Sequence, residues 1–270
     1  MGVIGIITCE VLELEFAHLL CADHDLSRIT VLEDIRSIRL IEILESKAAQ
    51  KLRRIPHMNS FIADHSQQDS GQPEVLIRVL ELALHRRKSI LQKGLINAAR
   101  EMRSHVDALL LGYGLCGGAL DNPQKLLDVD IPVFIPMDGD HPVDDCVGLL
   151  IGGRDNYYAE QCKIPGTYFM TPGWTYHWKR VFDPDSSSLK SEKVKRLFDR
   201  YERSLLVVTP VMPEDEMRQN VREFNELSGC RTELREGTME ILNETWKAVK
   251  AFIQNKDRLT STDKSRGNRP

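Results

Sequence analysis

The sequence predicts an α/β protein with a doubly wound, mostly parallel sheet and helices on both faces. Short apolar segments rich in β-branched residues alternate with longer segments of helical periodicity, which is typical of parallel β/α architecture. Several of the apolar segments are continuously hydrophobic, as in strands buried on both faces. The 270 residues, 41% of them hydrophobic, suffice for one large domain at 1–256 or for two closely packed lobes, 1–180 and 181–256. The polar residues 257–270 are expected to form a flexible tail.

The N-terminal half is expected to begin with a buried strand and a helix. The run 3–8 is apolar and β-branched, and 10–21 carries a broad apolar helical stripe. A short strand at 29–32 and a helix at 35–52 follow. The segment 74–103 is strongly charged, and we expect it to form one long helix.

The C-terminal half is dense in turns but continues the alternation. The pattern predicts strands at 106–111, 131–135, 166–170 and 205–209, and helices at 154–161, 191–203, 213–227 and 240–256. The segment 146–151 fits a strand or a buried turn of helix.

Three cysteines occupy places where α/β proteins bind their ligands. Cys9 directly follows the first strand, and Cys116 lies in the glycine loop after the strand 106–111. Cys146 follows the strand 131–135 by a loop that reaches toward the same edge. Because ligands bind beyond the carboxyl ends of parallel strands, we expect the three sulfur atoms to converge within one metal-sized sphere. The alternative is that each cysteine is a small buried hydrophobe.

Three thiolates suit two kinds of metal centre. They can bind zinc with a fourth position open, or bind three irons of a four-iron iron-sulfur cluster and leave one iron free. His141, Asp144 and the adjacent Asp145 could complete the ligand shell or supply a general base. A solvated acidic turn is the alternative for this segment.

The loop 112–117 matches the pattern G-x-G-x-x-G through Gly112, Gly114 and Gly117. In dinucleotide-binding proteins this loop opens a long helix after the first strand, whereas here Pro123 interrupts within a few residues. We therefore expect neither NAD nor NADP at this loop. The glycines instead would let the backbone approach a bound group closely.

Two further segments suggest ligand contacts. Gly152, Gly153 and Arg154 combine a helix N-terminus with a guanidinium, which suits an anionic group of a substrate, although a plain strand-to-helix turn explains them too. Tyr168 and Trp174 flank a tight turn and could form an aromatic wall over a ligand, or a packed hydrophobic corner.

Charge and end sequences exclude several classes of protein. The net charge of -4 offers no general attraction to nucleic acid or anionic lipid. The N-terminus lacks the basic region of a signal peptide, and no apolar stretch is long enough to span a membrane. We expect a cytoplasmic protein whose six cysteines are thiols or metal ligands and form no disulfides.

Several motifs together resemble a known family. They are the Cys9 turn, Gly-Tyr-Gly-Leu-Cys at 112–116, Asp-Cys at 145–146 before Leu-Leu-Ile-Gly at 149–152, and Pro-Gly-Thr-Tyr at 165–168 leading to Thr-Pro-Gly-Trp at 171–174. This combination resembles an uncharacterised family of anaerobic archaea and bacteria, the domain-of-unknown-function family numbered sixteen thirty-eight. The resemblance covers roughly the first strand to the last helix. It implies a role in anaerobic one-carbon metabolism beside corrinoid-dependent methyl transfer, with Cys9, Cys116 and Cys146 as the functional thiols.

Two functions from different classes follow. In the first, the protein is a metal-dependent enzyme acting on a small anionic substrate, with Cys9, Cys116 and Cys146 as ligands and His141 or Asp144 as proton carrier. In the second, it is a non-catalytic carrier, chaperone or sensor of a metal or corrinoid for a partner methyltransferase. An open coordination position beside a pocket would favour the enzyme, and a closed site would favour the carrier.

Overall fold

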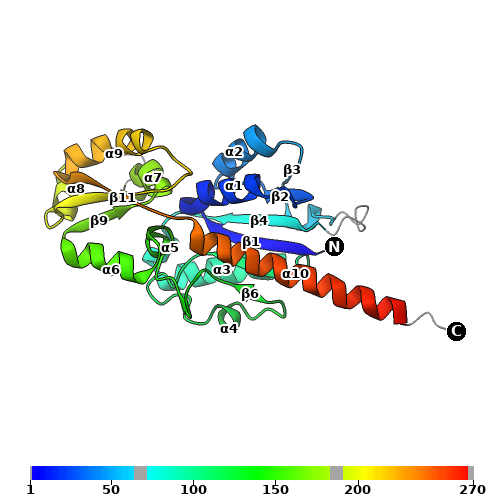
Figure 1. Cartoon of the computed structure of the whole chain (residues 1–270). Helices are drawn as coiled ribbons and strands as arrows, with labels where there is room; N and C mark the ends of the chain where they lie inside the picture. The colour runs from blue at the N-terminus through cyan, green and yellow to red at the C-terminus, as the bar shows by residue number, and fades with distance from the viewer. Residues whose placement is uncertain (1, 64–71, 183–190, 267–270) are drawn as a thin grey trace.

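A six-stranded, entirely parallel sheet forms the larger part of the molecule, which confirms the predicted α/β class (Figure 1). The computed structural model describes residues 2–63, 72–182 and 191–266. The strand order is β3-β2-β4-β1-β5-β6. The strands are β1 (Val3–Cys9), β2 (Arg28–Leu32), β3 (Leu52–Ile55), β4 (Glu74–Leu80), β5 (Ala108–Gly112) and β6 (Val133–Phe134).

The register of the central strands sets the position of the candidate site. Cys9 at the end of β1 is paired with Leu80 of β4, and Thr8 is paired with Gly112 of β5. The carboxyl ends of three neighbouring strands therefore stop at the same level. The chain runs outward from β1 in one direction and from β4 in the other, so this edge is a topological switch point.

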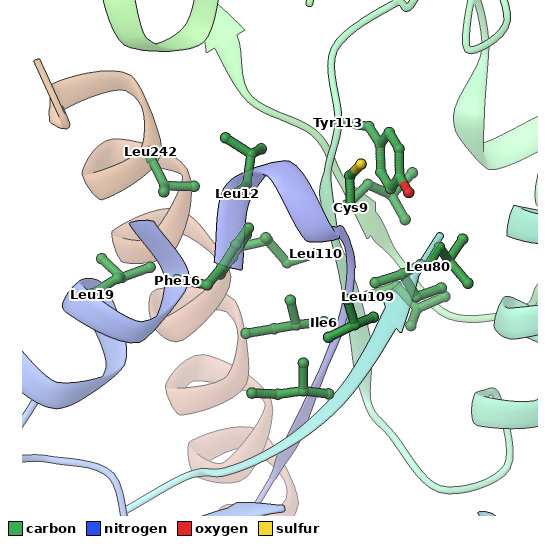
Figure 2. Packing of buried hydrophobic residues seen from close by; sticks show 14 of the residues in the cluster. Ile6, Cys9, Leu12, Phe16, Leu19, Leu80, Leu109, Leu110, Tyr113 and Leu242 are labelled. Atoms are coloured by element: carbon green, nitrogen blue, oxygen red, sulfur yellow. The ribbon is translucent and has the colours of Figure 1, made fainter. Parts of the chain in front are cut away.

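Helices flank this sheet on both sides. Figure 1 shows α1 (Glu13–Ala22) and α2 (Ile38–Ala48) on one side and α3 (Lys88–Met102) on the other. The last helix, α10 (Glu240–Arg266), packs against β1 and β5. Figure 2 shows its Leu242 in the same hydrophobic cluster as Leu12, Phe16 and Ile6 of β1. These apolar side chains are buried and form the main core.

A second, three-stranded parallel sheet faces the switch point, with order β11-β10-β9 (Figure 1). Its strands are β9 (Thr167–Met170), β10 (Arg203–Val208) and β11 (Arg231–Glu236), and its helices are α7 (Pro172–Phe182), α8 (Ser191–Phe198) and α9 (Glu214–Ser228). This sheet begins before residue 180, and α10 then returns to the first sheet. The tail expected at 257–270 continues α10 as far as Arg266, while 267–270 lie outside the described residues.

Between β6 of the first sheet and β9 of the second, the chain forms the hairpin strands β7 (Met137–Asp138) and β8 (His141–Pro142), α5 (Cys146–Ile151) and α6 (Arg154–Lys163). Short elements also lie between the strands of the first sheet: α4 (Pro123–Leu127) and the 3-10 helices η1 (Glu10–Leu12), η2 (Met58–Ser60) and η4 (Leu84–Arg86). None of the helices within the described ranges has the length and apolar character needed to cross a bilayer.

The prediction of one long helix over 74–103 was wrong. The structure has strand β4, then η4, and only then α3. The charged residues suggested a solvent-facing helix, but Arg78 pairs with Asp34 at 3.3 Å, which allows a charged side chain on a central strand. The helix expected over 35–52 is likewise shorter: α2 spans only Ile38–Ala48, and Leu52 already begins β3. The strand β11 was not predicted at all.

Candidate functional site

A cavity of about 380 Å³ lies between the carboxyl edge of the first sheet and the second sheet. We call it the cysteine pocket, because Cys9, Cys116 and Cys146 all line it. The other lining residues come from the loops after β1, β4 and β5, from α5 and α6, and from β9, α7 and the segment before β10. Its volume falls in the range of sites that bind small molecules.

Cys9 is placed by the close packing of β1 against β5. A Cβ atom on Gly112 would lie only 2.5 Å from the Thr8 hydroxyl oxygen, so a larger residue there would force the strand ends apart. Cys9 is buried and ends β1, and the chain turns at once into η1. Figure 2 shows its side chain next to Tyr113, which follows Gly112.

Cys116 is placed by contact between two loops. The N-H groups of Leu115 and Cys116 donate to the carbonyls of Val143 and Asp144, both at 2.8 Å. Gly114 makes this contact possible, because a Cβ atom there would lie 2.5 Å from the Val143 carbonyl oxygen. The same contact holds Cys116 at φ +47, a left-handed conformation that non-glycine residues rarely adopt. Backbone strain of this kind is found more often at functional sites.

Cys146 begins α5, directly after a carboxylate that caps this helix. One oxygen of Asp145 accepts the N-H groups of Val147 and Gly148 at 2.8 and 2.9 Å. The other oxygen accepts the Tyr157 hydroxyl at 3.4 Å. The cap therefore fixes the Asp145 side chain in the wall of the cysteine pocket, between two cysteine-bearing loops.

Burial keeps the three thiols neutral. It raises the pKa of Cys9 and of Cys116 to about 12, and raises that of Cys146 well above its usual range. Burial also raises the pKa of Asp145, against the opposing effect of the Gly148 and Val147 N-H groups. Thiolates at these positions would need a cation beside them, which a metal could supply.

The side chains are not arranged as a finished metal site. Within the part of the chain that the structure describes, no group of three or more His, Cys, Asp or Glu side chains is placed to hold a metal ion. The three thiols share one cavity without forming such a group.

Aromatic side chains close the cavity on the side of the second sheet. Tyr168 of β9, Trp174 of α7 and Tyr157 of α6 line this side of the cavity. The ring centroids of Tyr168 and Trp174 are 6.5 Å apart. His85, from the loop after β4, makes an edge contact with Trp174 at 6.4 Å. The two aromatic residues expected from the sequence to contact a ligand are therefore in the cavity wall.

The structure places His141 and Asp144 outside the cavity. The His141 side chain is 64% exposed and its Nε2 lies 3.3 Å from Asp140. Asp144 pairs with the Arg154 guanidinium at 3.2 Å. Neither residue lines the cysteine pocket, and Asp145 is the carboxyl that does. Asp144 contacts the Cys116 loop only through its backbone carbonyl, because its side chain turns toward Arg154 of α6.

The structure places Gly152, Gly153 and Arg154 apart from the cysteines, in a turn that has its own partners within the protein. None of the three lines the cysteine pocket. Asp138 of the β7–β8 hairpin already accepts the Arg154 N-H at 2.7 Å, and the Gly153 N-H donates to the Gly148 carbonyl at 2.9 Å. The turn is a helix start capped by the protein's own carboxylate, whereas Gly112, Gly114 and Gly117 do line the cavity.

The lining residues that sequence reasoning missed include His85, Tyr113 and Tyr157. His85 falls within the range 74–103 that was predicted to be one helix, so no loop was expected there. Tyr113 lies between Gly112 and Gly114, and only the glycines of this motif were considered as ligand contacts. The Tyr113 hydroxyl lies beside the Cys9 thiol, is buried, and makes no hydrogen bond of normal geometry within the described ranges.

Comparisons with known proteins point to one family. No curated protein matches this chain, and no solved structure does. A family model described as "Protein of unknown function (DUF1638)" matches residues 79–246. The match includes Cys116, Cys146, Tyr168 and Trp174, whereas β1 and Cys9 precede it. Because it covers more than half of the 270 residues, the chain belongs to the DUF1638 family.

Proposed function

We propose that this protein is a metal-dependent enzyme in which Cys9, Cys116 and Cys146 bind a metal centre that faces a small-molecule pocket. One observation carries the proposal: three cysteines from three separate loops line a single cavity at the switch point of the parallel sheet. Free cysteines that serve only as core hydrophobes have no reason to gather in one cavity.

The donor set fits a metal better than it fits an empty pocket. Neutral thiols are poor hydrogen-bond partners, and the chain has a cysteine at a left-handed backbone position that glycine would adopt without strain. Zinc with three cysteine ligands and an open position is the first candidate. The thiols would have to turn toward one another to bind a single ion, since the described side chains form no such group. This favours a second candidate, a four-iron iron-sulfur cluster with one open iron, because a cluster accepts thiolates that are farther apart.

The remaining residues have distinct roles in this proposal. A bound metal would act as a Lewis acid and lower the pKa of a thiol or water bound to it. Asp145 would accept or return a proton at the carboxylate oxygen that does not cap α5. Tyr168 and Trp174 would exclude water from the reacting group and pack against the substrate.

The reaction we propose is methyl or related group transfer involving a small anionic molecule, within anaerobic one-carbon metabolism. The family resemblance suggests one-carbon metabolism, and the volume of the cysteine pocket is consistent with a small substrate. A volume of about 380 Å³ admits a small organic molecule but not a whole corrinoid. A carrier of corrinoid for a partner methyltransferase would have to bind that cofactor elsewhere on its surface, so the enzyme is the better supported function.

Metal analysis of anaerobically purified protein tests the proposal. We expect about one metal centre per chain, with a brown absorbing species for iron and sulfur or a colourless stoichiometric metal for zinc. Single replacements of Cys9, Cys116 or Cys146 by Ser should each lower the metal content several-fold. Cys162→Ser is the matched control, because Cys162 is an exposed cysteine.

Thermal unfolding of the same variants separates loss of metal from loss of fold. Metal binding that is weak in the parent, or that survives all three replacements, would refute the proposal. Equal loss of metal in Cys162→Ser would do so as well.

A further inference from the structure

A second cavity, of about 520 Å³, lies on the other side of the loop that borders the cysteine pocket. Leu82 lines both cavities, while His85 lines the cysteine pocket and its neighbour Arg86 lines the second one. The second cavity is also lined by Arg87 and by Arg180 of α7, and we call it the arginine cavity.

The charges in the arginine cavity are unbalanced. Among the described residues, the guanidinium groups of Arg86 and Arg87 have no hydrogen-bond or ion-pair partner. Arg180 binds Glu10 at 2.8 Å. Within the described ranges, the acidic residue that lines the cavity is Glu81. Glu81 pairs at 3.5 Å with Arg36, which is not a lining residue, and not with the arginines of the cavity. Arg86 and Arg87 are exposed, so water screens their repulsion, and both guanidinium groups are accessible to an anionic group that enters the cavity.

The loop that carries these arginines is held in a defined shape. The Leu82 N-H donates to Glu10, the buried residue directly after Cys9, at 2.7 Å. Ala83 has φ +61, a left-handed conformation that costs energy in a non-glycine residue. The Arg86 N-H closes the turn onto the Ala83 carbonyl at 3.1 Å. The turn therefore presents His85 to one cavity and Arg86 to the other.

The two cavities adjoin each other, because Leu82 lines both of them. Burial raises the pKa of Tyr168 in the wall of the cysteine pocket, and the positive charge of Arg86 opposes that effect. The Arg86 guanidinium therefore lies near this wall as well as in the arginine cavity.

We propose that the arginine cavity binds the oxyanion of the substrate, most strongly a phosphate group, while the organic part of the molecule extends toward the cysteine pocket. Guanidinium groups pair with oxyanions through two parallel hydrogen bonds, and a phosphate dianion can satisfy more than one of them. The cavity is larger than a phosphate ion, which leaves room for the adjoining atoms of an ester. The inference deepens the proposed function and relies on it for the identity of the neighbouring pocket. It moves the anion anchor from Arg154 to Arg86 and Arg87.

Calorimetric titration with inorganic phosphate tests this proposal, with acetate as the second probe. Phosphate should bind saturably and more tightly than acetate, whereas the reverse order would identify a carboxylate as the ligand group and overturn the preference for phosphate. The double variant Arg86→Ala, Arg87→Ala should weaken phosphate binding roughly tenfold or more. Replacement of both by Lys should restore part of the affinity, because the charge returns without the planar fork.

The control is Arg100→Ala, which removes an exposed arginine of α3, the helix that follows the two arginines, away from both cavities. Its phosphate affinity should equal that of the parent. Without phosphate, the double alanine variant should unfold at the same temperature as the parent or higher, because it lacks the repulsion between cations. The proposal would be overturned if the parent and the double alanine variant had the same affinity for phosphate. So would a short oligonucleotide that binds more tightly than phosphate and depends on the same arginines.

A cysteine variant keeps this test independent of the metal. Cys116→Ser should retain phosphate binding even though it loses metal, and the double alanine variant should retain metal. If metal binding fails in every protein while phosphate binding behaves as stated, only the proposed function is refuted. If metal binding behaves as expected and the arginine replacements leave phosphate binding unchanged, only the arginine cavity is refuted.

Discussion

Glu15 offers a stringent test of the electrostatics of the core. This residue of α1 is fully buried, and within the described ranges both of its carboxyl oxygens lack a hydrogen-bond partner. Burial raises its pKa from 4.5 to about 8. The folded protein therefore holds a proton on Glu15 at neutral pH, whereas the unfolded chain does not. Between pH 4.5 and about 8, the folded state binds more protons, so its stability must fall as the pH rises.

The magnitude follows from the difference between the two pKa values. A difference of 8 − 4.5 = 3.5 units, at about 1.36 kcal/mol per unit, gives an upper limit of about 5 kcal/mol between pH 4.5 and pH 8. Relaxation of the surroundings reduces such values, so we expect a loss of about 2 to 5 kcal/mol that levels off above pH 8.

Glu15→Gln should remove this dependence, because the amide has nearly the same shape and does not ionise. Urea denaturation of parent and variant at several pH values between 5 and 9 measures the effect. The two proteins should have similar free energies of unfolding near pH 5, and the variant should be more stable by a few kcal/mol near pH 8. Glu42→Gln, at an exposed position of α2, is the control and should follow the parent at every pH. A constant difference between parent and Glu15→Gln across this range would show that the carboxyl is not protonated in the folded state.

Three further predictions concern the walls of the cysteine pocket. Gly114→Ala should lower the free energy of unfolding, measured in urea, by about 1 to 3 kcal/mol, because the added Cβ would press against the Val143 carbonyl. An unchanged free energy would show that the Gly114 loop and the Val143 loop can separate without cost. Tyr113→Phe should leave stability unchanged or raise it, since the hydroxyl has no partner of normal geometry within the described ranges; a loss of about 1 kcal/mol or more would reveal a hydrogen bond. Cys116→Gly should be more stable than Cys116→Ala by about 1 kcal/mol in thermal unfolding, because both lack the thiol and only glycine relieves the left-handed backbone, and equal stabilities would exclude strain there.

Much of the site could be predicted because its parts follow strands that are easy to recognise. The apolar runs that became β1 and β5 end at Cys9 and Gly112, and parallel strands bring such ends to one edge. The location of Cys116 in the cavity follows from the glycine loop after β5. The aromatic wall was also expected, although the sequence left open whether Tyr168 and Trp174 face a ligand or a packed corner.

The strand β4 shows where sequence patterns mislead. Its residues are apolar and β-branched, but charged neighbours on both sides favoured a helix. The strand is central, between β2 and β1, and its charged side chain is accommodated by an ion pair with a distant residue. A contact of that kind has no local signature. The error also hid the loop after β4, which carries His85 and Arg86.

The sequence by itself determined the class of fold, several buried strands, among them β1, β2, β5 and β10, and the position of three cysteines at one edge of the sheet. Those features depend on hydrophobic periodicity and on turn residues, which are local properties of the chain. Only the tertiary structure decided that Asp145, and not Asp144 or His141, faces the cysteine pocket. Neighbouring side chains in an extended segment point in opposite directions, and the packing of 143–145 against the Gly114 loop selects which one turns inward. The tertiary structure likewise pairs Arg154 with Asp144 and, among the residues it describes, gives Arg86 and Arg87 no partner, because the pairing of charges depends on which surfaces the fold brings together.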